Sequence, residues 1–508
     1  MLYTIFSHTK QAINSLWKWR FFKNKTRTPL LTFILFLSSS LLSAQQKSSE
    51  VDVLISTFLG NEKRNYYGNK APDTLNLVWK IYLGEGISPA YGKDKVWKGA
   101  GWTGQPLLVR ENQELFLIQG AFDYHLKKIK ASTGELVWQY KYEDILKGTG
   151  TIFENKEAQD PESKYIIMQG SRLGFWNDHE DRYIPSFRGI SLLSGKELWR
   201  MNVKKTDCYS RDVDGSAVVV GKLAYLALEN GIFTVFSPDP QKLERLDGVM
   251  QPKILQEITY YKQEDMDLHG RDLVSESSPS ILNGRVFTLS GTGRIYGYNL
   301  KEKKNDWEYY IGTDLNGSAP VTNDGCLLIP VEKQYMPGHG GVMKIDPSKQ
   351  GHDCVVWFYP TIDKKWYHWE GGIIGSVSCN DAYISEKDDH LAVFLDVAGE
   401  LTVLDHKRTE KGKLVLGPDA LTSFNTPKLV VKTQIPGSIS TPLIVKDKIV
   451  ACTDAGIFLF QLIKNRSTYE LKLLDKVEGL EIDSTPIVWD GRVYIAVRDG
   501  YMYCFGDL

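Results

Sequence analysis

The chain has 508 residues, with 61 basic and 62 acidic side chains and a formal net charge of −1 at pH 7. This balance provides no attraction for nucleic acid or for an anionic membrane surface. Hydrophobic residues make up 42% of the chain, so it can bury a large core. The length suggests either several domains or one large repeat architecture.

The first 44 residues differ from the rest of the chain. Six basic residues precede the apolar run "LLTFILFLSSSLLSA", and the first acidic residue is Glu50. A basic region, a short apolar stretch and a small residue at Ala44 predict a signal peptide over 1–44 and export to the periplasm or the extracellular space. The alternative is a retained membrane anchor, although the serines at 38–40 leave the run short of the roughly 20 residues that a span needs. We expect no transmembrane domain in the mature chain.

Two sequence elements alternate through the rest of the chain, each eight times. The first is a Ser/Thr/Gly-rich step, often ending in Pro, that leads into an apolar strand; its copies are 102–109, 148–153, 214–220, 276–282, 316–322, 375–380, 437–445 and 482–489. The second is a Gly followed by alternating apolar residues; its copies are 124–134, 188–195, 231–236, 293–300, 341–346, 399–405, 456–462 and 500–506.

A third element closes several of these units with a strand that carries a Trp. Its copies are 133–140, 195–201, 304–310 and 353–359, and three other units end in a strand without Trp. The unit is therefore four short strands, repeated every 41 to 66 residues. Such units are typical of β-propellers, so we predict an all-β, eight-bladed propeller with four-stranded antiparallel blades.

The last unit, "DSTPIVWDGRVYIAVRDGYMYCFGDL", contains only three strands, separated by turns at Asp490-Gly491 and Asp499-Gly500. Residues 75–84, "LNLVWKIYLG", form a Trp strand with no three strands before it. We expect this strand to pair with Tyr501–Phe505 and to close the ring inside the last blade, which removes exposed sheet edges. The alternative is an amino-terminal strand that packs elsewhere.

The six cysteines are far apart in the sequence and form no C-x-x-C motif, which argues against a metal or haem site. In an oxidising compartment they could pair. The other interpretation is that they are small buried apolar residues in strands.

The motifs "TGELVW", "GKELW" and "DGYMYCF" resemble the Trp-docking repeats of pyrroloquinoline-quinone-type eight-bladed propellers. The resemblance covers nearly all of residues 75–508, which we assign to one quinoprotein-like propeller domain. Residues 45–74 then form an amino-terminal lead segment between the signal peptide and the propeller.

The resemblance implies two functional classes. The first comprises quinone-dependent dehydrogenases, which hold the quinone and Ca²⁺ on the channel axis beside a catalytic Asp. This chain lacks the adjacent cysteines and the C-x-x-C-H haem motif of many such enzymes. The second class is non-catalytic and includes the propeller subunit of the outer-membrane protein assembly machinery. This chain departs from that subunit as well, because no Cys follows the signal peptide to carry a lipid.

Polar residues in the steps before the strands are the candidate site residues. Carboxylate and amide oxygens suit Ca²⁺, so the predicted metal ligands are Asp212, Asp214, Glu276 and Asn316. The predicted cofactor-binding residues are Arg211, Arg271, Trp366 and Trp369. Either arginine could hold a carboxylated ligand such as the quinone by forked hydrogen bonds, and either tryptophan could stack on its ring. Each set also has a structural alternative. The acidic residues can form turns, the arginines can pair with acids across blades, and the tryptophans can cover a loop or a partner surface. No catalytic residue is predicted.

Three functions follow. The first is an exported, non-catalytic binding or scaffold protein of the cell envelope, with a protein partner at 334–341 or 364–372 and room for a small polar ligand in the channel. The second is a dehydrogenase that oxidises alcohols or sugars with pyrroloquinoline quinone and Ca²⁺ at the channel mouth. The third is a sugar- or polysaccharide-active propeller whose aromatic loops stack on sugar rings.

Overall fold

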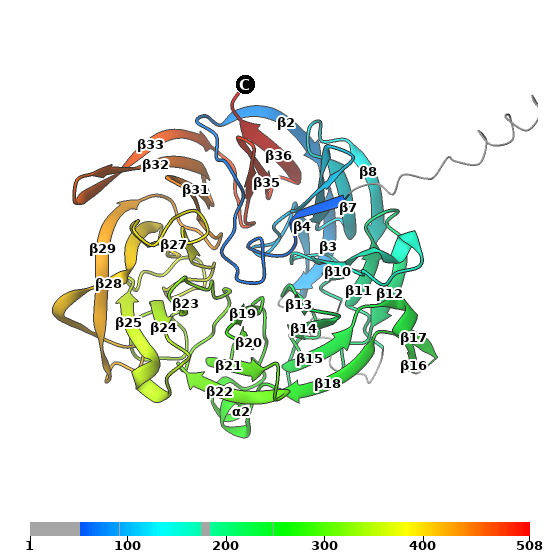
Figure 1. Cartoon of the computed structure of the whole chain (residues 1–508), viewed down its shortest axis with the longest axis horizontal. Helices are drawn as coiled ribbons and strands as arrows, with labels where there is room; N and C mark the ends of the chain where they lie inside the picture. The colour runs from blue at the N-terminus through cyan, green and yellow to red at the C-terminus, as the bar shows by residue number, and fades with distance from the viewer. Residues whose placement is uncertain (1–50, 91, 174–182, 247) are drawn as a thin grey trace, which may run out of the picture. The chain divides into compact units, whose positions relative to one another are not determined.

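The computed structural model describes residues 51–90, 92–173, 183–246 and 248–508. In these residues the protein is an all-β, eight-bladed propeller of small antiparallel sheets around a central axis (Figure 1), as the sequence predicts. The signal peptide predicted over 1–44, together with residues 45–50, lies outside the described residues. No helix in the described part of the chain is long and apolar enough to cross a membrane.

The first four blades follow one another along the chain. Their strands are β5 (Leu107–Glu111), β6 (Glu114–Gly120), β7 (His125–Lys130) and β8 (Leu136–Lys141); β9 (Thr151–Glu154), β10 (Tyr165–Gly170), β11 (Phe187–Ser191) and β12 (Glu197–Met201); β13 (Val218–Val220), β14 (Leu223–Ala227), β15 (Ile232–Ser237) and β18 (Lys253–Thr259); and β19 (Ser280–Leu282), β20 (Arg285–Leu289), β21 (Arg294–Asn299) and β22 (Lys304–Tyr310).

The other four blades complete the ring. Their strands are β23 (Leu327–Val331), β24 (Gly341–Ile345) and β25 (Val355–Pro360); β26 (Ser378–Cys379), β27 (Leu391–Leu395), β28 (Glu400–Leu416) and β29 (Ser423–Gln434); β30 (Leu443–Val445), β31 (Lys448–Thr453), β32 (Gly456–Asn465) and β33 (Thr468–Glu478); and β34 (Ile487–Trp489), β35 (Arg492–Ala496), β36 (Tyr501–Gly506) and β2 (Asn76–Tyr82).

Two blades differ from the four-stranded plan. β1 (Val51–Ile55) pairs with β5 and adds a fifth strand to the first blade. The fifth blade has three strands. In place of a fourth, a single antiparallel bridge joins Val321 to Leu327, the first residue of β23. The remaining elements are the hairpins β3 (Glu85–Ala90)–β4 (Lys93–Lys98) and β16 (Glu244–Leu246)–β17 (Val249–Gln251), helix α2 (Gln263–His269) and the short 3-10 turns Pro161–Ser163, Pro240–Lys242 and Gly351–Cys354.

The last blade takes its fourth strand from the amino-terminal part of the chain. β2 pairs antiparallel with β36, with Leu77 opposite Phe505 and Tyr82 opposite Tyr501. β34 and β35 are joined by a two-residue turn in which Asp490 and Gly491 both have positive φ, 48° and 71°. This is the turn geometry for which Asp-Gly pairs are favoured in hairpins. Figure 1 shows the blue β2 beside the red β36 at the seam of the ring.

Tryptophans join successive blades. Each of five indoles donates its Nε1–H to a main-chain oxygen of the next blade, and the pairs are Trp79–Ala131 (2.9 Å), Trp138–Leu192 (3.2 Å), Trp199–Pro238 (2.9 Å), Trp307–Lys349 (2.7 Å) and Trp357–His406 (2.9 Å). The blade of β18 has no Trp in its outer strand, and there Gln256 Nε2 donates to the main-chain oxygen of Lys303 at 3.2 Å instead.

The lead segment fills the channel between the blades. Between β1 and β2, its main chain bonds in turn to Ile152, Ile281, Val321, Val488 and Gly491, residues that belong to four blades. Phe58, Leu59 and Tyr67 are buried with it. The segment leaves the ring at the turn between β34 and β35, where Asn69 contacts Asp490. We call this end of the channel the closed end.

Arg64 is the anchor of the lead segment inside the ring. Its side chain is fully buried, and its guanidinium donates to the main-chain oxygens of Pro279, Phe58 and Ser216 and to the Thr57 hydroxyl, at 2.7–3.0 Å. Hydrogen bonds to four acceptors compensate for the loss of hydration of the charge. Arg64 therefore ties the segment to two blades at once.

All six cysteines lie in the described part of the chain, where they are buried and unpaired. Burial raises the pKa of each thiol above its ordinary value, so they act as small apolar residues.

Candidate functional site

Acidic side chains gather at the channel end opposite the closed end. We call this end the acidic mouth; its carboxylates come from the segments that precede β13, β19 and β23 and from the turns that follow β14 and β23. They are Asp212, Asp214, Glu229, Asp272, Glu276, Asp314 and Glu332, which are buried except for the half-buried Asp272 and Glu276. The lead segment lies beneath them in the channel, so this mouth does not open through the ring.

Three of these carboxylates surround one lysine. Lys147 Nζ lies 2.6 Å from Asp214 and 3.8 Å from Glu276. Asp214, Glu229 and Glu276 each place one oxygen within 4.8 Å of the other two. Ser210 donates to one oxygen of Glu229, and the other has no hydrogen-bond partner in the described part of the chain. When all three carboxylates are ionised, one lysine leaves two negative charges in the group. A divalent cation bound here would balance them.

Burial and the repulsion between neighbouring carboxylates shift the pKa values of these groups. Burial is the largest influence on Glu276 and, with nearby carboxylates, raises its pKa to about 8. Burial, with the charges of neighbouring carboxylates, also raises the pKa of Asp212 and of Glu229 well above the ordinary values. Burial acts to lower the pKa of Lys147, but the charges of Asp214, Glu229 and Glu276 raise it overall, so the ammonium stays charged.

The structure brings only some of the predicted metal ligands together. Asp214 and Glu276 come together in the Lys147 group, which Glu229 completes. Asp212 lies beside it, 3.8 Å from Arg172. Asn316 instead donates to Glu332 at 2.5 Å. Sequence reasoning missed Glu229 and Glu332 because each follows a buried strand in a turn, where a carboxylate normally indicates only solvent exposure.

The predicted cofactor-binding arginines both bond to main-chain oxygens of the segment between β12 and β13. Arg211 is buried and donates to the main-chain oxygen of Val203 at 2.7 Å. Arg271 is exposed, and its guanidinium donates to the main-chain oxygens of Asp207 and Cys208 at 3.1 and 3.2 Å. These bonds give both side chains a structural role in the segment that leads to Asp212.

The predicted stacking tryptophans stack on each other. Trp366 and Trp369 form a tight turn with main-chain bonds in both directions, and their rings lie 5.5 Å apart at 17°. They are half-buried and pack on Ile374, Val397 and Ile439, with Trp102 beside them. In this arrangement one ring of the pair already stacks on the other, and the prediction that they stack on a cofactor stays a prediction.

Two arginines from other blades contact Trp97 of the β3–β4 hairpin. The guanidiniums of Arg172 and Arg498 lie over the Trp97 ring, 5.2 Å and 5.4 Å from its centroid. Each arginine has an acidic neighbour, Asp212 for Arg172 and Asp483 for Arg498 at 3.4 Å. The sequence offered no signal for this group, because the hairpin that carries Trp97 is not part of the repeat.

A second group of possible metal ligands lies at the boundary between the fifth and sixth blades. Asp381 Oδ1 lies 2.7 Å from His390 Nδ1 and 3.1 Å from His406 Nε2. The opposite ring nitrogens face ammonium groups, with Lys407 at 3.1 Å from His390 and Lys344 at 3.3 Å from His406. An ammonium has no lone pair, so these nitrogens accept and the N–H groups point to Asp381. The cluster is therefore a hydrogen-bond network with no nitrogen lone pair aimed at a metal.

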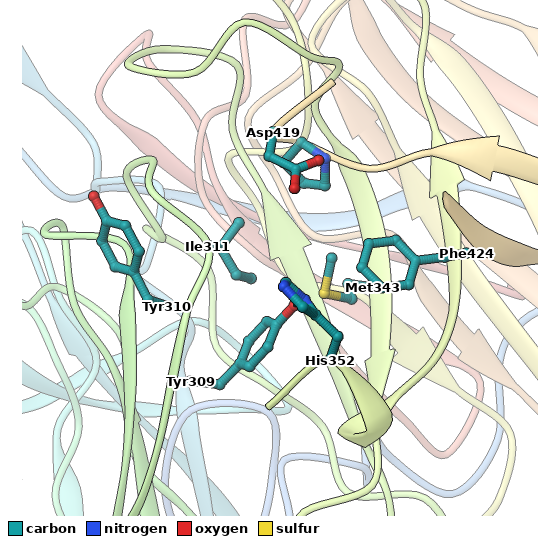
Figure 2. A pocket seen from close by; sticks show the side chains of 8 residues that line it. Tyr309, Tyr310, Ile311, Met343, His352, Asp419 and Phe424 are labelled. Atoms are coloured by element: carbon teal, nitrogen blue, oxygen red, sulfur yellow. The ribbon is translucent and has the colours of Figure 1, made fainter. Parts of the chain in front are cut away.

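A hollow lies between β22, the fifth blade and the β28–β29 hairpin (Figure 2). It is lined by Tyr309, Tyr310, Met343, His352 and Phe424 among others, and encloses about 250 Å³ including space open to solvent. It forms where the end of the β28–β29 hairpin folds over the fifth blade. Its aromatic side chains belong to the packing between blades, which gives the hollow a structural origin.

No family model matches the chain, and no curated protein matches it in sequence. Several solved structures share its fold. BamB from Moraxella catarrhalis has a TM-score of 0.51 and 11% identity, and the match covers 85% of this chain and 100% of BamB. The quinohemoprotein alcohol dehydrogenase of Comamonas testosteroni has a TM-score of 0.53 and 10% identity, with coverage of 92% and 82%.

A europium-containing methanol dehydrogenase gives a TM-score of 0.55 at 10% identity, covering 92% of this chain and 100% of that protein. At these identities the likeness establishes the fold alone. The chain has the eight-bladed architecture of the quinone-type propellers that its Trp repeats resemble, and this architecture carries both catalytic and non-catalytic proteins.

Proposed function

We propose that the protein is a non-catalytic binding or scaffold propeller of the cell envelope. The observation that carries this proposal is the closed channel, because the chain's own lead segment occupies the space between the blades and Arg64 fastens it there. Export rests on the signal peptide predicted over 1–44. One structural neighbour, BamB, and the non-catalytic class that the repeats resemble support the same role.

The rim of the acidic mouth offers a surface for a protein partner. Ile362 and Tyr367, on the loop before Trp369, are 62% and 67% exposed, and Ile87 and Val96 of the β3–β4 hairpin are 56% and 50% exposed. The predicted contact segment 364–372 belongs to this rim. The other predicted segment, 334–341, is partly covered, since Gly338 bonds to the main-chain oxygen of Pro418. Exposed apolar groups ringed by polar residues are typical of interaction surfaces.

Site-specific photo-crosslinking tests this partner surface. A crosslinking amino acid is placed at Tyr367, and in a matched control at Leu255, which is 50% exposed on the outer strand β18. We expect one defined adduct in the envelope fraction from position 367, lost when Val96→Asp is added, and none from position 255. Equal adducts at both positions, or none at position 367, would contradict the proposed surface.

A quinone-dependent dehydrogenase is the second candidate. The group of Asp214, Glu229 and Glu276 favours it, because three carboxylates within 4.8 Å suit Ca²⁺, which would supply Lewis-acid chemistry there. The residues present do not fit the quinone. Its three carboxylates would meet a mouth in which carboxylates outnumber cations, and the predicted partners Arg211 and Arg271 bond to the main chain.

One measurement separates the two candidates. The purified protein is incubated with pyrroloquinoline quinone and CaCl₂, with CaCl₂ alone, and with neither, and Tm and dye reduction with alcohols and aldoses are recorded. A ligand that binds only the folded state raises Tm. We expect no shift specific to the quinone and no dye reduction. A quinone shift that disappears in Glu229→Gln would instead establish the dehydrogenase.

A further inference from the structure

Three carboxylates of the acidic mouth have no cationic partner in the described part of the chain. We call them the Asp314 cluster (Asp272, Asp314 and Glu332). Their hydrogen bonds come from neutral groups, since Asn316 donates to Glu332 at 2.5 Å and the Tyr335 hydroxyl donates to Asp272 at 2.8 Å. Asp314 Oδ1 has no hydrogen-bond partner among the described residues, although Asp314 is only 8% exposed.

Burying acidic groups without a counterion is unfavourable, and two other buried aspartates of this chain show how partners can compensate for it. Asp214 is paired with Lys147, and Asp381 lies between two histidines. In the Asp314 cluster, burial and the neighbouring carboxylates raise the pKa of Glu332 to about 8 and that of Asp314 well above its ordinary value. A cation bound among these groups would offset both the lost hydration and the repulsion.

The spacing of the carboxylates distinguishes between kinds of cation. Among the described residues, three candidate ligand atoms come within 4.8 Å of one another only in the Asp214 and Asp381 groups. A bare Ca²⁺ bonds its ligands at about 2.3–2.6 Å and favours such a compact group, which the Asp314 cluster does not form. The N–H groups of an ammonium or a guanidinium extend further and bond acceptors at about 2.7–2.9 Å.

Two aromatic side chains stand beside the cluster. Tyr335 is half-buried and its ring lies 4.3 Å from that of His269. Neither ring nitrogen of His269 has a hydrogen-bond partner in the described part of the chain, at 6% exposure. Burial lowers the pKa of His269, so the neutral ring offers one further acceptor. An aromatic ring next to carboxylates is a favourable environment for an organic cation.

We propose that the Asp314 cluster binds an organic cation, an alkyl ammonium or guanidinium group, that approaches on the side of Asp272 and Tyr335. The cation donates to Asp314, Glu332 and Asp272. This site does not depend on the scaffold role, because a free amine and a basic side chain of a partner protein carry the same chemistry.

Calorimetric titration with agmatine, which carries both cation types, tests the site. We expect binding to the wild-type protein at pH 8.5, at least about 10-fold weaker binding to Asp314→Asn and Glu332→Gln, and unchanged binding to Glu302→Gln, whose carboxylate is exposed. Tetramethylammonium, which has no N–H donor, should bind at least about 10-fold more weakly than agmatine. Equal affinities for the wild-type and Asp314→Asn proteins would overturn the proposal, as would no binding at about 10 mM agmatine.

Two further arms identify the ligand and guard against unfolding. The peptide acetyl-Ala-Arg-Ala-amide replaces agmatine; tighter binding of the peptide assigns the site to a protein side chain, and tighter binding of agmatine assigns it to a free amine. Both variants should melt at or above the wild-type Tm, because each removes an uncompensated buried charge. A CaCl₂ titration that Asp314→Asn abolishes would overturn the assignment to an organic cation.

The pH dependence of agmatine binding gives a readout that a surface attraction would not produce. The titratable groups that face the cluster are Glu276, His269 and Tyr335; Lys147 acts on Glu276 and Arg294 on His269, one group further away. Agmatine binds the ionised carboxylates, and their pKa values are raised, so affinity should increase about 10-fold or more between about pH 6 and pH 9. Ordinary surface carboxylates are ionised throughout this range, and a flat profile would overturn the proposal.

Discussion

Trp79 donates its indole Nε1–H to the main-chain oxygen of Ala131 at 2.9 Å, and so joins the last blade to the first. The strand of Trp79 comes early in the chain, but it is the fourth strand of the blade that ends at Gly506. Four other tryptophans make the same bond between successive blades. The ring is therefore closed at its seam by the same contact that holds its other interfaces, which explains why the Trp position recurs in the sequence.

Replacing a docking tryptophan should be strongly destabilising. Trp357 is fully buried and bonds to His406, so Trp357→Ala removes a large side chain and a hydrogen bond, and we expect the free energy of unfolding to fall by about 3–5 kcal/mol. Trp357→Phe should have a smaller effect, because an aromatic ring is retained. Chemical denaturation measures both. Trp366→Ala, at the rim of the mouth, is the control, and an equal loss there would contradict a special role for docking.

Removing the lead segment and β2 should prevent folding. A chain that begins at Glu85 lacks Arg64, the buried Tyr67 and the outer strand of the last blade, so the channel and one sheet edge are exposed together. A chain that begins at Glu50 keeps all of these and serves as the control. Gel filtration and near-UV circular dichroism should give a compact, packed particle only for the longer chain. A chain from Glu85 with the wild-type Tm would refute this account of ring closure.

The fold can be predicted well from the sequence because the same strand pattern recurs in each blade. Strand number, Trp position and the missing strand of the last blade each follow from patterns that recur along the chain. The site is predicted only in part, since Asp214 and Glu276 lie in repeated steps whereas Glu229 and Glu332 follow strands. Arg64 gives no sequence signal, because a lone arginine in a polar segment normally lies in solvent and only the closed ring makes it buried.

Glu332→Gln should stabilise the protein at high pH and not at low pH. The pKa of Glu332 is raised in the folded state to about 8, above its unfolded value, so the folded protein holds a proton that the unfolded chain releases. Stability therefore falls as pH rises from about 4.5 to about 8. We expect the variant to exceed the wild type by about 1–3 kcal/mol at pH 8.5 and to match it near pH 4.5.

Urea denaturation across this pH range measures the effect on Glu332. Glu302→Gln removes an exposed carboxylate and controls for the change in net charge. A loss of stability in Glu332→Gln at pH 8.5 would mean that the ionised carboxylate has a favourable partner, and would contradict an uncompensated cluster.

Asp381→Asn should show the opposite pH dependence. Burial acts to raise the pKa of Asp381, but hydrogen bonds from His406 and His390 and from the main-chain N–H of Asn323 lower it below its ordinary range. The ionised carboxylate therefore contributes stability that is present above about pH 4 and is lost as pH falls below it. At pH 7 the variant leaves the facing N–H groups without an anionic acceptor, and we expect a loss of about 3 kcal/mol.

The measurement for Asp381 is the urea midpoint of the wild-type and variant proteins between pH 3 and pH 7. Asp353→Asn, which removes an exposed carboxylate, is the control and should follow the wild type throughout. Adding ZnCl₂ should leave the wild-type midpoint unchanged, because the ring nitrogens that face Asp381 carry protons and their other nitrogens face Lys344 and Lys407. A zinc-dependent increase that Asp381→Asn removes would show that the histidines can turn their lone pairs to a metal, and the network interpretation would then be wrong.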